Sequence, residues 1–225
     1  MSKQKKPRNK RYRPRMTYPN PLILNANPDK IEERLNRLEA GISMRFNQIA
    51  NGTAERQTYL DVFDVFRAFY VHALAFENKS ELQGIMVIGG AACCLCAQLQ
   101  FRENEKIPES ALRPIALGIE ACVEMMKNAT IMELGKVFQL VDHSSKSIIK
   151  AHANACWFFS PNDKSEGNRK LLGRTGMTVL HGKLRTGYIR ENLDLERMEW
   201  FSPLDETTIA IEENILVVLA EPMEK

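Results

Sequence analysis

The sequence predicts a mainly α-helical protein of the α+β kind: an antiparallel bundle of about five helices with a small C-terminal antiparallel β element. Between residues 27 and 156, apolar residues recur at spacings of three and four, as on the buried face of an amphipathic helix. Short connectors separate these segments, and helices joined in this way pack as antiparallel neighbours. After residue 160, short runs of β-branched and apolar residues replace the helical spacing.

The first two helices have clear boundary signals. Asn27-Pro28-Asp29 supplies an N-cap, a proline at the first helical position and an acid in the first turn. The periodic segment that follows stops at Asn51-Gly52, which is typical of a helix end. The second helix is expected after Thr53 and continues to about Leu74, with an apolar face that is rich in aromatic residues.

Capping boxes mark two of the remaining helices. Ser80-Glu81-Leu82-Gln83 has this form and opens a third helix that is expected to end near Phe101. A fourth helix is expected from Glu109 to Lys127. Thr130-Ile131-Met132-Glu133 is a second capping box, and it predicts a fifth helix through about Cys156.

The C-terminal segment is expected to be β-rich. Residues 161–176 are rich in Gly, Lys, Arg, Asn and Ser, which indicates an exposed linker or loop. We expect a strand from Met177 to Leu184 and a hairpin formed by Thr207–Ile211 and Ile215–Leu219. The predicted organisation is a disordered basic arm at 1–21, the bundle at 27–160, the linker at 161–176, and a small β-rich element at 177–225 that packs on the bundle.

The N-terminal arm carries a strong charge imbalance. The chain has 31 basic and 28 acidic residues, and its first fifteen residues hold eight of the cations and no acid. Residues 16–225 therefore hold 23 basic and 28 acidic residues, which predicts a polyanionic partner for the arm. The candidate nucleic-acid-binding residues are Lys3, Lys5, Lys6, Arg8, Lys10, Arg11, Tyr12, Arg13 and Arg15.

The chemistry of the arm fits nucleic acid without base specificity. Arginines pair with phosphate oxygens in bidentate fashion, and Tyr12 can stack on an unpaired base. The arm has too few apolar residues to offset its ordering entropy, so it is expected to be disordered in isolation. A solubilising tail, contact with an anionic membrane surface and a localisation signal stay open as alternatives.

A second basic run follows residue 160, and it can be either a phosphate-contacting surface or a solvated loop. Asp163 and Glu166 are the acids that offset it. Its cations are Lys164, Arg169, Lys170, Arg174, Lys183, Arg185 and Arg190, of which Arg169, Lys170, Arg174, Lys183 and Arg185 are the candidate site residues.

No enzymatic, metal or cofactor site is predicted. Cys93, Cys94 and Cys96 lie in an apolar run and are interpreted as buried, reduced thiols, because no four-ligand zinc set accompanies them. The residues of Asp142-His143-Ser144-Ser145 are neighbours on one helix and point in different directions, so they cannot form a catalytic triad.

Reduced cysteines and the lack of a signal-peptide pattern indicate a cytoplasmic protein of a bacterial host cell, and no membrane span is expected. The basic start runs into Pro and Asn, so no signal peptide is expected. The uncharged stretch 82–101 is diluted by Gln and Gly, and we interpret it as a core helix of the bundle.

The first helix also predicts self-association. Its apolar residues form a narrow seam that can pair across a two-fold axis or dock on the protein's own bundle. The seam residues proposed for a homodimer are Ile31, Leu35, Leu38 and Ile42.

The N-terminal residues resemble a known class of sequences. Arg11-Tyr12-Arg13-Pro14-Arg15, followed by Tyr18-Pro19-Asn20-Pro21 and amphipathic helices, is similar to uncharacterised phage and prophage helical proteins with a Lys/Arg-rich tail of this type. The resemblance implies a mobile-element origin and no site residues. The leading hypothesis is a non-enzymatic nucleic-acid-associated accessory protein of a phage or prophage. The alternative is a module that binds or inhibits a host or viral protein, with the arm providing electrostatic steering.

Overall fold

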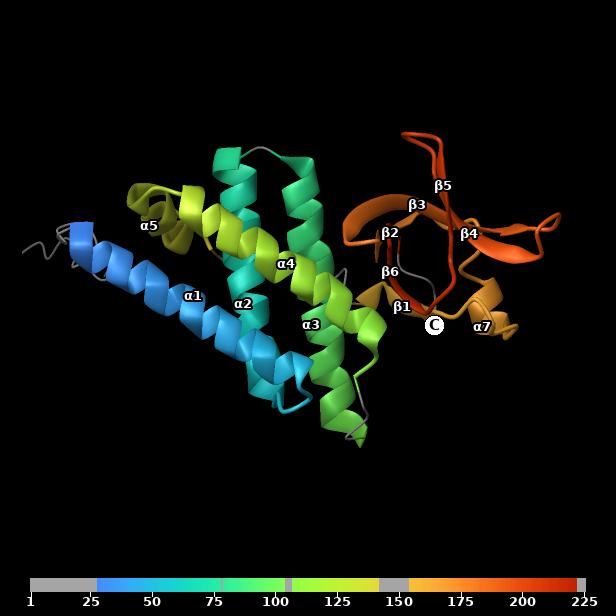
Figure 1. The fold of residues 1–225 in the computed structure, drawn as a ribbon, viewed down its shortest axis with the longest axis horizontal. Coiled ribbons are helices and arrows are strands. Elements are labelled where there is room, and N and C mark those ends of the chain that lie inside the picture. The colour runs from blue at the N-terminus through green and yellow to red at the C-terminus, as the bar shows by residue number, and fades with distance from the viewer. Residues whose placement is uncertain (1–27, 78, 104–106, 142–153, 222–225) are drawn as a thin grey trace, which may run out of the picture.

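The protein combines a helical bundle with a large, strongly curved β-sheet. The computed structural model describes residues 28–77, 79–103, 107–141 and 154–221. Figure 1 shows the helices on one side and a six-stranded antiparallel sheet beside them. The expectation of a helical bundle with only a small C-terminal β element is therefore wrong, because the sheet is a major part of the fold.

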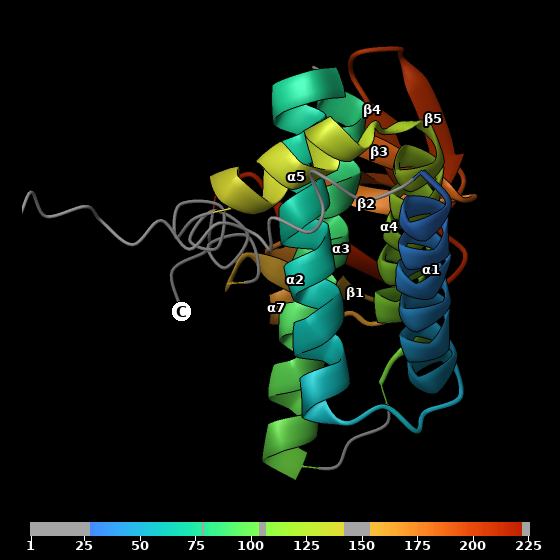
Figure 2. The ribbon, with the colours of Figure 1, turned by 90° about the vertical axis from the view of Figure 1, so that its left-hand side faces the viewer.

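The helices form two crossing layers. Figures 1 and 2 show α2 and α3 side by side in one layer, with α1 and α4 crossing over them in the other. A short π-helical turn, η2, continues α2. The bounds are α1 (Pro28–Ala50), α2 (Arg56–His72), η2 (Ala73–Glu77), α3 (Ser80–Glu103), α4 (Glu109–Asn128) and α5 (Ile131–Leu140).

The first four helices begin and end within a few residues of the predicted positions, and the fifth differs. The capping box at its start is confirmed: the Thr130 hydroxyl accepts a hydrogen bond from the Glu133 N–H, and the Glu133 carboxylate accepts one from the Thr130 N–H. However, α5 ends at Leu140, and Cys156 begins a strand. A helix through Cys156 is therefore wrong at that end.

The bundle core combines large aromatic side chains with small ones that let helices approach closely. Ala91, Ala92 and Cys93 of α3 are fully buried. The Phe66 ring of α2 lies where a Cβ at Gly118 would be, with 2.6 Å between them, so α2 and α4 need glycine at this contact. Ser80–Leu99 has the length and mean hydropathy (1.7) of a membrane span, and 67% of it is buried inside the protein.

The sheet has two halves that share one long strand. Its order is β1-β6-β2-β3-β4-β5, and every pairing is antiparallel. The first half of β3 pairs with β2 and its second half with β4. The bounds are β1 (Cys156–Phe159), α7 (Glu166–Arg169), β2 (Gly176–Leu180), β3 (Lys183–Asn192), β4 (Arg197–Ser202), β5 (Thr207–Ala210) and β6 (Ile215–Leu219).

β3 changes partners at Gly187, where its backbone comes very close to that of β4. A Cβ at this position would lie 2.1 Å from the Phe201 carbonyl oxygen of β4. Only glycine allows the two backbones to come this close. Thr186 and Gly187 both lie inside β3, although Thr-Gly is a pair that is common in turns.

The other strand predictions need correction as well. The strand expected from Met177 to Leu184 is two strands, β2 and β3, joined by a turn at His181 and Gly182. β5 and β6 lie where the hairpin was expected, but β5 pairs with β4, and β6 pairs with β1 and β2. Residues 161–176, expected as a linker, hold helix α7 and the buried Leu171.

Strand β6 joins the two halves of the molecule because it is buried on both faces. Leu216 and Val218 belong to the hydrophobic core of the helical bundle. Ile215, Val217 and Leu219 alternate with them and belong to a second core inside the curved sheet. Alternating side chains point to opposite faces of a strand, so one strand serves both cores.

Candidate nucleic-acid interface

The residues with the strongest sequence signal lie outside the described part of the chain. This holds for the whole arm, from Lys3 to Arg15, and for the segment Asp142-His143-Ser144-Ser145. The structure therefore addresses what the body of the protein adds to the arm.

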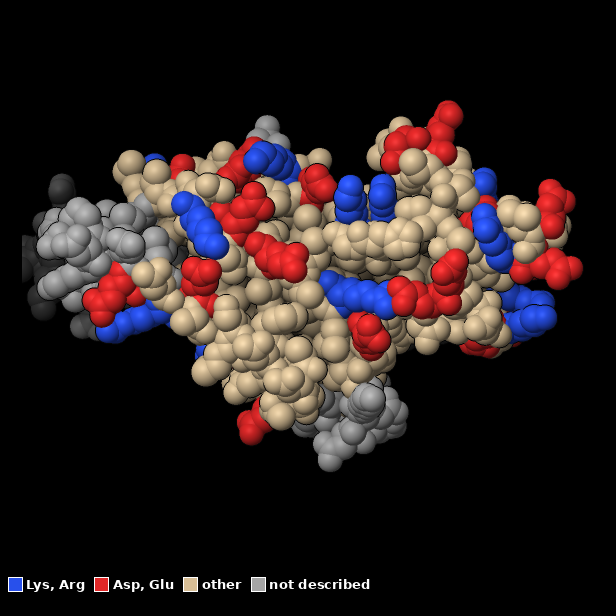
Figure 3. All heavy atoms as spheres, in the orientation of Figure 1, with Lys and Arg blue, Asp and Glu red and all other residues tan. Residues whose placement is uncertain are grey.

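The described body opposes many of its cations with nearby carboxylates. Arg45 of α1 bonds Asp61 of α2 at 2.9 Å, and Arg67 bonds Asp64 at 2.8 Å. On the face seen in Figure 3, basic and acidic side chains are interspersed, and neither sign covers it alone. Such a surface gives little net attraction for a polyanion.

The second basic run is distributed over several elements. Arg169 and Lys170 lie at α7, Arg174 in the loop that follows, and Lys183 and Arg185 on β3. The structure brings Arg174 and Lys170 together, since the Arg174 guanidinium donates to the Lys170 carbonyl at 3.2 Å. Carboxylates accompany two of these cations: Glu166 lies 3.0 Å from Lys170, and Asp205 lies 3.7 Å from Arg185.

An ordered aromatic and arginine cluster lies on the outer face of β3 and β4. Ile189 and Trp200 are paired across these strands and point into the sheet core, so their neighbours point outward. On this outer face the Tyr188 and Phe201 rings pack edge to face, with centroids 5.4 Å apart. The Arg190 guanidinium lies over the Phe201 ring, 4.5 Å from its centroid.

A buried carboxylate fixes this cluster. Glu199 is 1% exposed and directly opposite Arg190 in the strand register. Its carboxylate accepts hydrogen bonds from Asn192 at 3.0 Å, Arg197 at 3.0 Å and Arg190 at 3.4 Å. Burial alone would raise the pKa of the Glu199 carboxyl, but these hydrogen bonds together lower it. The carboxylate stays ionised and holds the arginines in place.

A cleft of about 970 Å³ opens at the mouth of the curved sheet. Its apolar lining comes from Phe159, Leu172, Met198 and Ile211, and its rim carries charges of both signs. The Asn168 side chain rigidifies one wall, because its amide donates to the carbonyls of Ser160 and Asp163. The cleft is preformed, but its mixed rim does not select a ligand class.

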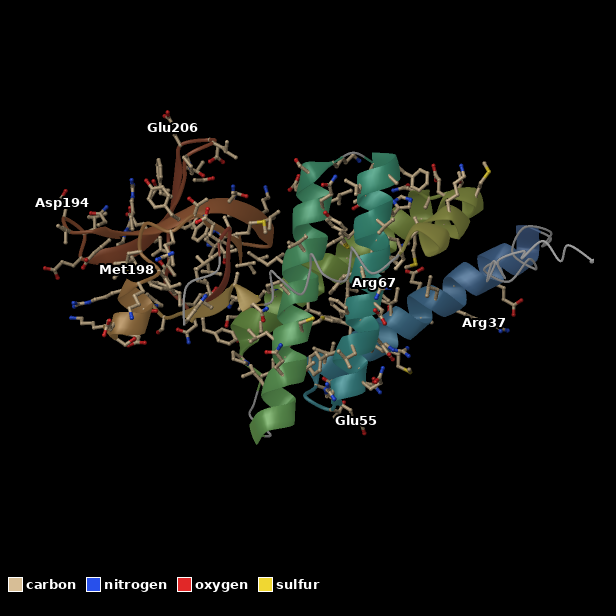
Figure 4. All side chains as sticks on the ribbon, turned by 180° about the vertical axis from the view of Figure 1, so that it is seen from behind. Arg37, Glu55, Arg67, Asp194, Met198 and Glu206 are labelled. Carbon is tan, nitrogen blue, oxygen red and sulfur yellow. The ribbon has the colours of Figure 1, made fainter. Side chains whose placement is uncertain are left out.

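Two hairpin tips expose large apolar side chains. Leu193 and Leu195 are 77% and 56% exposed at the β3–β4 tip, and Leu204 is 86% exposed at the β4–β5 tip. Figure 4, in which Asp194 and Glu206 mark these tips, shows both hairpins projecting from the sheet, with the tip at Asp194 pointing away from the helices. Isolated leucines on a surface are common, but these sit at the ends of ordered hairpins.

The cysteines lie in the bundle core or against it. The chain's five cysteines are within the described residues and form no disulfide bond. Burial raises the pKa of the Cys93 thiol and raises that of Cys96 to about 12, so both are protonated at neutral pH. Among the described residues, no group of three or more His, Cys, Asp or Glu side chains is placed to hold a metal ion.

His72 is the notable titratable group of the bundle. It is 1% exposed at the end of α2, between the Phe69 and Phe76 rings, and neither ring nitrogen has a hydrogen-bond partner among the described residues. Desolvation lowers the pKa of His72, although Glu77 and Glu133 oppose this shift. The imidazole is therefore neutral at neutral pH.

Part of the predicted dimer seam lies in the protein's own core. Ile42 is 3% exposed, and Leu38 packs against the same core. Ile31 and Leu35 are on α1, but their side chains lie outside the described set.

Sequence reasoning missed the aromatic cluster. The sequence places Arg190 in the second basic run, and no motif marks Tyr188, Glu199 or Phe201. The sequence signal for this cluster is a period of two. Polar and aromatic residues occur at every second position in two neighbouring segments, which is typical of one face of a β-hairpin: Tyr188, Arg190 and Asn192, then Arg197, Glu199 and Phe201.

Compared with known proteins, the chain matches no family model, no curated protein and no solved structure, so its function has to be inferred from its own residues.

Proposed function

We propose that the protein is a non-enzymatic, nucleic-acid-associated accessory protein of a phage or prophage, which binds phosphates through its basic arm. The observation that carries this proposal is the charge split, with eight cations in the first fifteen residues and a net acidic remainder. The resemblance of the Arg11-Tyr12-Arg13-Pro14-Arg15 tail to phage proteins supports the origin.

The described body of the protein supports the assignment of phosphate binding to the arm. Carboxylates lie beside many of its cations, as in the Arg45–Asp61 and Lys170–Glu166 pairs. The unbalanced cations of the arm are therefore the main source of affinity for a polyanion. Contact of all eight with a duplex would give a log-log salt slope of about −7, and partial engagement roughly half of that.

The test is a full-length variant in which the eight arm cations are changed to glutamine. We expect the parent to bind DNA with a steep salt dependence and the variant to lose most of this binding, since each lost phosphate contact reduces the slope by about 0.9. The thermal unfolding of the variant should match that of the parent, because the arm has too few apolar side chains to join the core. Equal binding by both proteins at about 50 mM salt would contradict the proposal.

The exposed leucines favour a second candidate, a module that binds a host or viral protein. Leu193, Leu195 and Leu204 are held on ordered hairpins, where they are available to a partner with apolar pockets. Here the arm would steer the protein toward an acidic partner. Purification from the native host, with and without nuclease treatment, separates the two candidates: a nucleic-acid-mediated complex dissociates on treatment, and a protein complex that depends on Leu204 does not.

A further inference from the structure

The outer face of β3 and β4 carries a cluster of two aromatic rings and one guanidinium that is partly open to solvent. The Phe201 ring forms its base, and the Tyr188 ring meets that base edge to face, at an interplanar angle of 61°. The central carbon of the Arg190 guanidinium lies over the Phe201 ring, 4.5 Å from its centroid, and the Arg190 side chain is 41% exposed. One side of the guanidinium therefore lies against Phe201, while the side chain keeps access to solvent.

The guanidinium is held in place before any ligand arrives. It donates to the Thr208 hydroxyl of β5 at 3.1 Å and to the Glu199 carboxylate at 3.4 Å, so it reaches across β4. An arginine fixed on three sides loses little rotamer entropy when a ligand stacks on it. This anchoring is expected of a binding platform, whereas an arginine that merely solubilises a sheet face needs no such support.

The chemistry of the cluster suits a planar ligand that carries phosphate. Arg190 and Arg197 share the single carboxylate of Glu199. A guanidinium plane stacks on nucleobases, and its N–H groups bond phosphate. In a duplex the base faces are already stacked on one another, so a platform of this kind selects unpaired bases.

We propose that this face binds an unpaired base of a single-stranded nucleic acid, stacked on the outer plane of Arg190 with Phe201 beneath it. This inference rests on the proposed function, since the arm brings the strand to the protein. The eight cations of the arm supply affinity for the phosphates of any strand, and the platform joins Tyr12 in preferring strands whose bases are unpaired.

Two probes of equal charge separate contacts with bases from contacts with phosphates, and the Arg190 variant then separates the platform from Tyr12 of the arm. One is a short single-stranded DNA, and the other is an abasic strand with the same phosphates and no bases. We expect the parent protein to bind the DNA strand about tenfold more tightly, because base stacking on a protein side chain is of this size. Arg190→Lys keeps the positive charge and removes the planar group, so it should lose most of this difference while binding the abasic strand like the parent.

Phe201→Leu is the second variant, because it removes the ring beneath the guanidinium and keeps the charge. Arg37→Lys is the matched control, since Arg37 lies on α1, far from the sheet, and pairs with Glu33. Thermal unfolding of each variant shows whether it is folded. If Phe201→Leu does not fold, Arg190→Lys decides alone.

The outcomes distinguish this inference from the function on which it rests. The platform is overturned if the parent binds the abasic and DNA strands equally. It is also overturned if Arg190→Lys leaves the difference between these two affinities intact. Either result can occur together with a loss of binding to both strands in the glutamine variant of the arm, which would still support the proposed function. A parent that binds neither strand overturns the platform and the nucleic-acid function together, and the sheet face is then open to a protein partner. Loss of only the base-dependent part in Arg190→Lys supports the platform.

Discussion

The helical bundle and the curved sheet differ in the titratable side chains that they bury. The bundle core combines aromatic rings such as Phe66 with small residues such as Ala91 and Cys96, and its buried histidine, His72, is neutral. The sheet core holds Trp200 and Phe159, and the sheet also buries the ionised Glu199. The sheet half therefore buries a charge, which the described part of the bundle does not.

The sheet half also contains the conformational exceptions. Within the described residues, the non-glycine residues with positive φ are His181 (51°), Glu196 (47°) and Glu206 (55°), and all three lie in its turns. A left-handed residue other than glycine costs roughly 1–2 kcal/mol. A buried charge, left-handed backbone and the leucines of two hairpin tips occur together in one half, which is why we place the body's proposed contribution to binding there and interpret the bundle as its scaffold.

The largest expected effect concerns the strand that both halves share. Leu216→Ala removes a buried side chain of β6 from the bundle core and should lower the free energy of unfolding by about 2–5 kcal/mol. Both tryptophans of the chain, Trp157 and Trp200, lie in the sheet half, so fluorescence reports on the sheet and far-ultraviolet circular dichroism mainly on the helices. Because β6 joins the two cores, we expect one coincident denaturation transition by both probes.

Leu204→Ala is the control for this substitution. Its side chain is 86% exposed at a hairpin tip, so the change in stability should stay within about 0.5 kcal/mol. Separate midpoints for fluorescence and circular dichroism would show that the bundle and the sheet unfold independently, and the shared-core interpretation of β6 would then fail.

The same contrast explains what could be predicted from the sequence. Helices α1 to α4 are specified locally, by apolar spacing and by end signals such as Pro28 and Gly52. Strands β3 and β4 alternate apolar residues with charged ones such as Arg190 and Glu199. Because of these charges, the two segments lack the apolar, β-branched runs from which strands are predicted. The pairing of β6 with β1 and β2 depends on contacts distant in sequence, and so does the cluster of Arg190 with Phe201.

The next effect tests the close approach of β3 to β4 at Gly187. Gly187→Ala places a Cβ against the backbone of β4, where neither strand can yield without breaking the pairing, so we expect a loss of about 3 kcal/mol. Gly41→Ala in α1 is the matched control, because the nearest neighbour of its Cβ is the flexible end of Arg45, at 3.8 Å. There, alanine should stabilise the helix by about 0.5–1 kcal/mol. Chemical denaturation measures both, and equal effects of the two substitutions would contradict the close approach at Gly187.

A smaller effect tests the one buried histidine of the described bundle. The pKa of His72 is lowered in the folded state, so the unfolded chain binds its proton more readily. The stabilising contribution of neutral His72 is complete above the ordinary histidine pKa of about 6.5 and declines as the pH falls below it. We expect the unfolding free energy to decline from pH 7 to pH 5 less in His72→Gln than in the parent. Parallel pH profiles would show that His72 does not contribute to this decline.

The smallest expected effect concerns the ion pair that links the two halves at the surface. Arg113 of α4 donates through both terminal nitrogens to the Glu213 carboxylate, in the connection between β5 and β6. This hydrogen bonding lowers the pKa of Glu213 and raises that of Arg113. The two side chains are 29% and 56% exposed, so solvent screens the pair and a double-mutant cycle with Arg113→Gln and Glu213→Gln should give a coupling of only about 0.5–1 kcal/mol.

The pH dependence and a control pair sharpen this last test. Because the folded pKa of Glu213 is depressed, the coupling is fully present above the ordinary glutamate pKa and is lost as the pH falls through the folded value. The control is Arg37 with Glu33, an exposed pair within α1 that joins no separate elements. Its coupling should be smaller, about 0.3–0.5 kcal/mol. A coupling for Arg113 and Glu213 no larger than this would mean that the contact between bundle and sheet depends on β6 and its apolar neighbours alone.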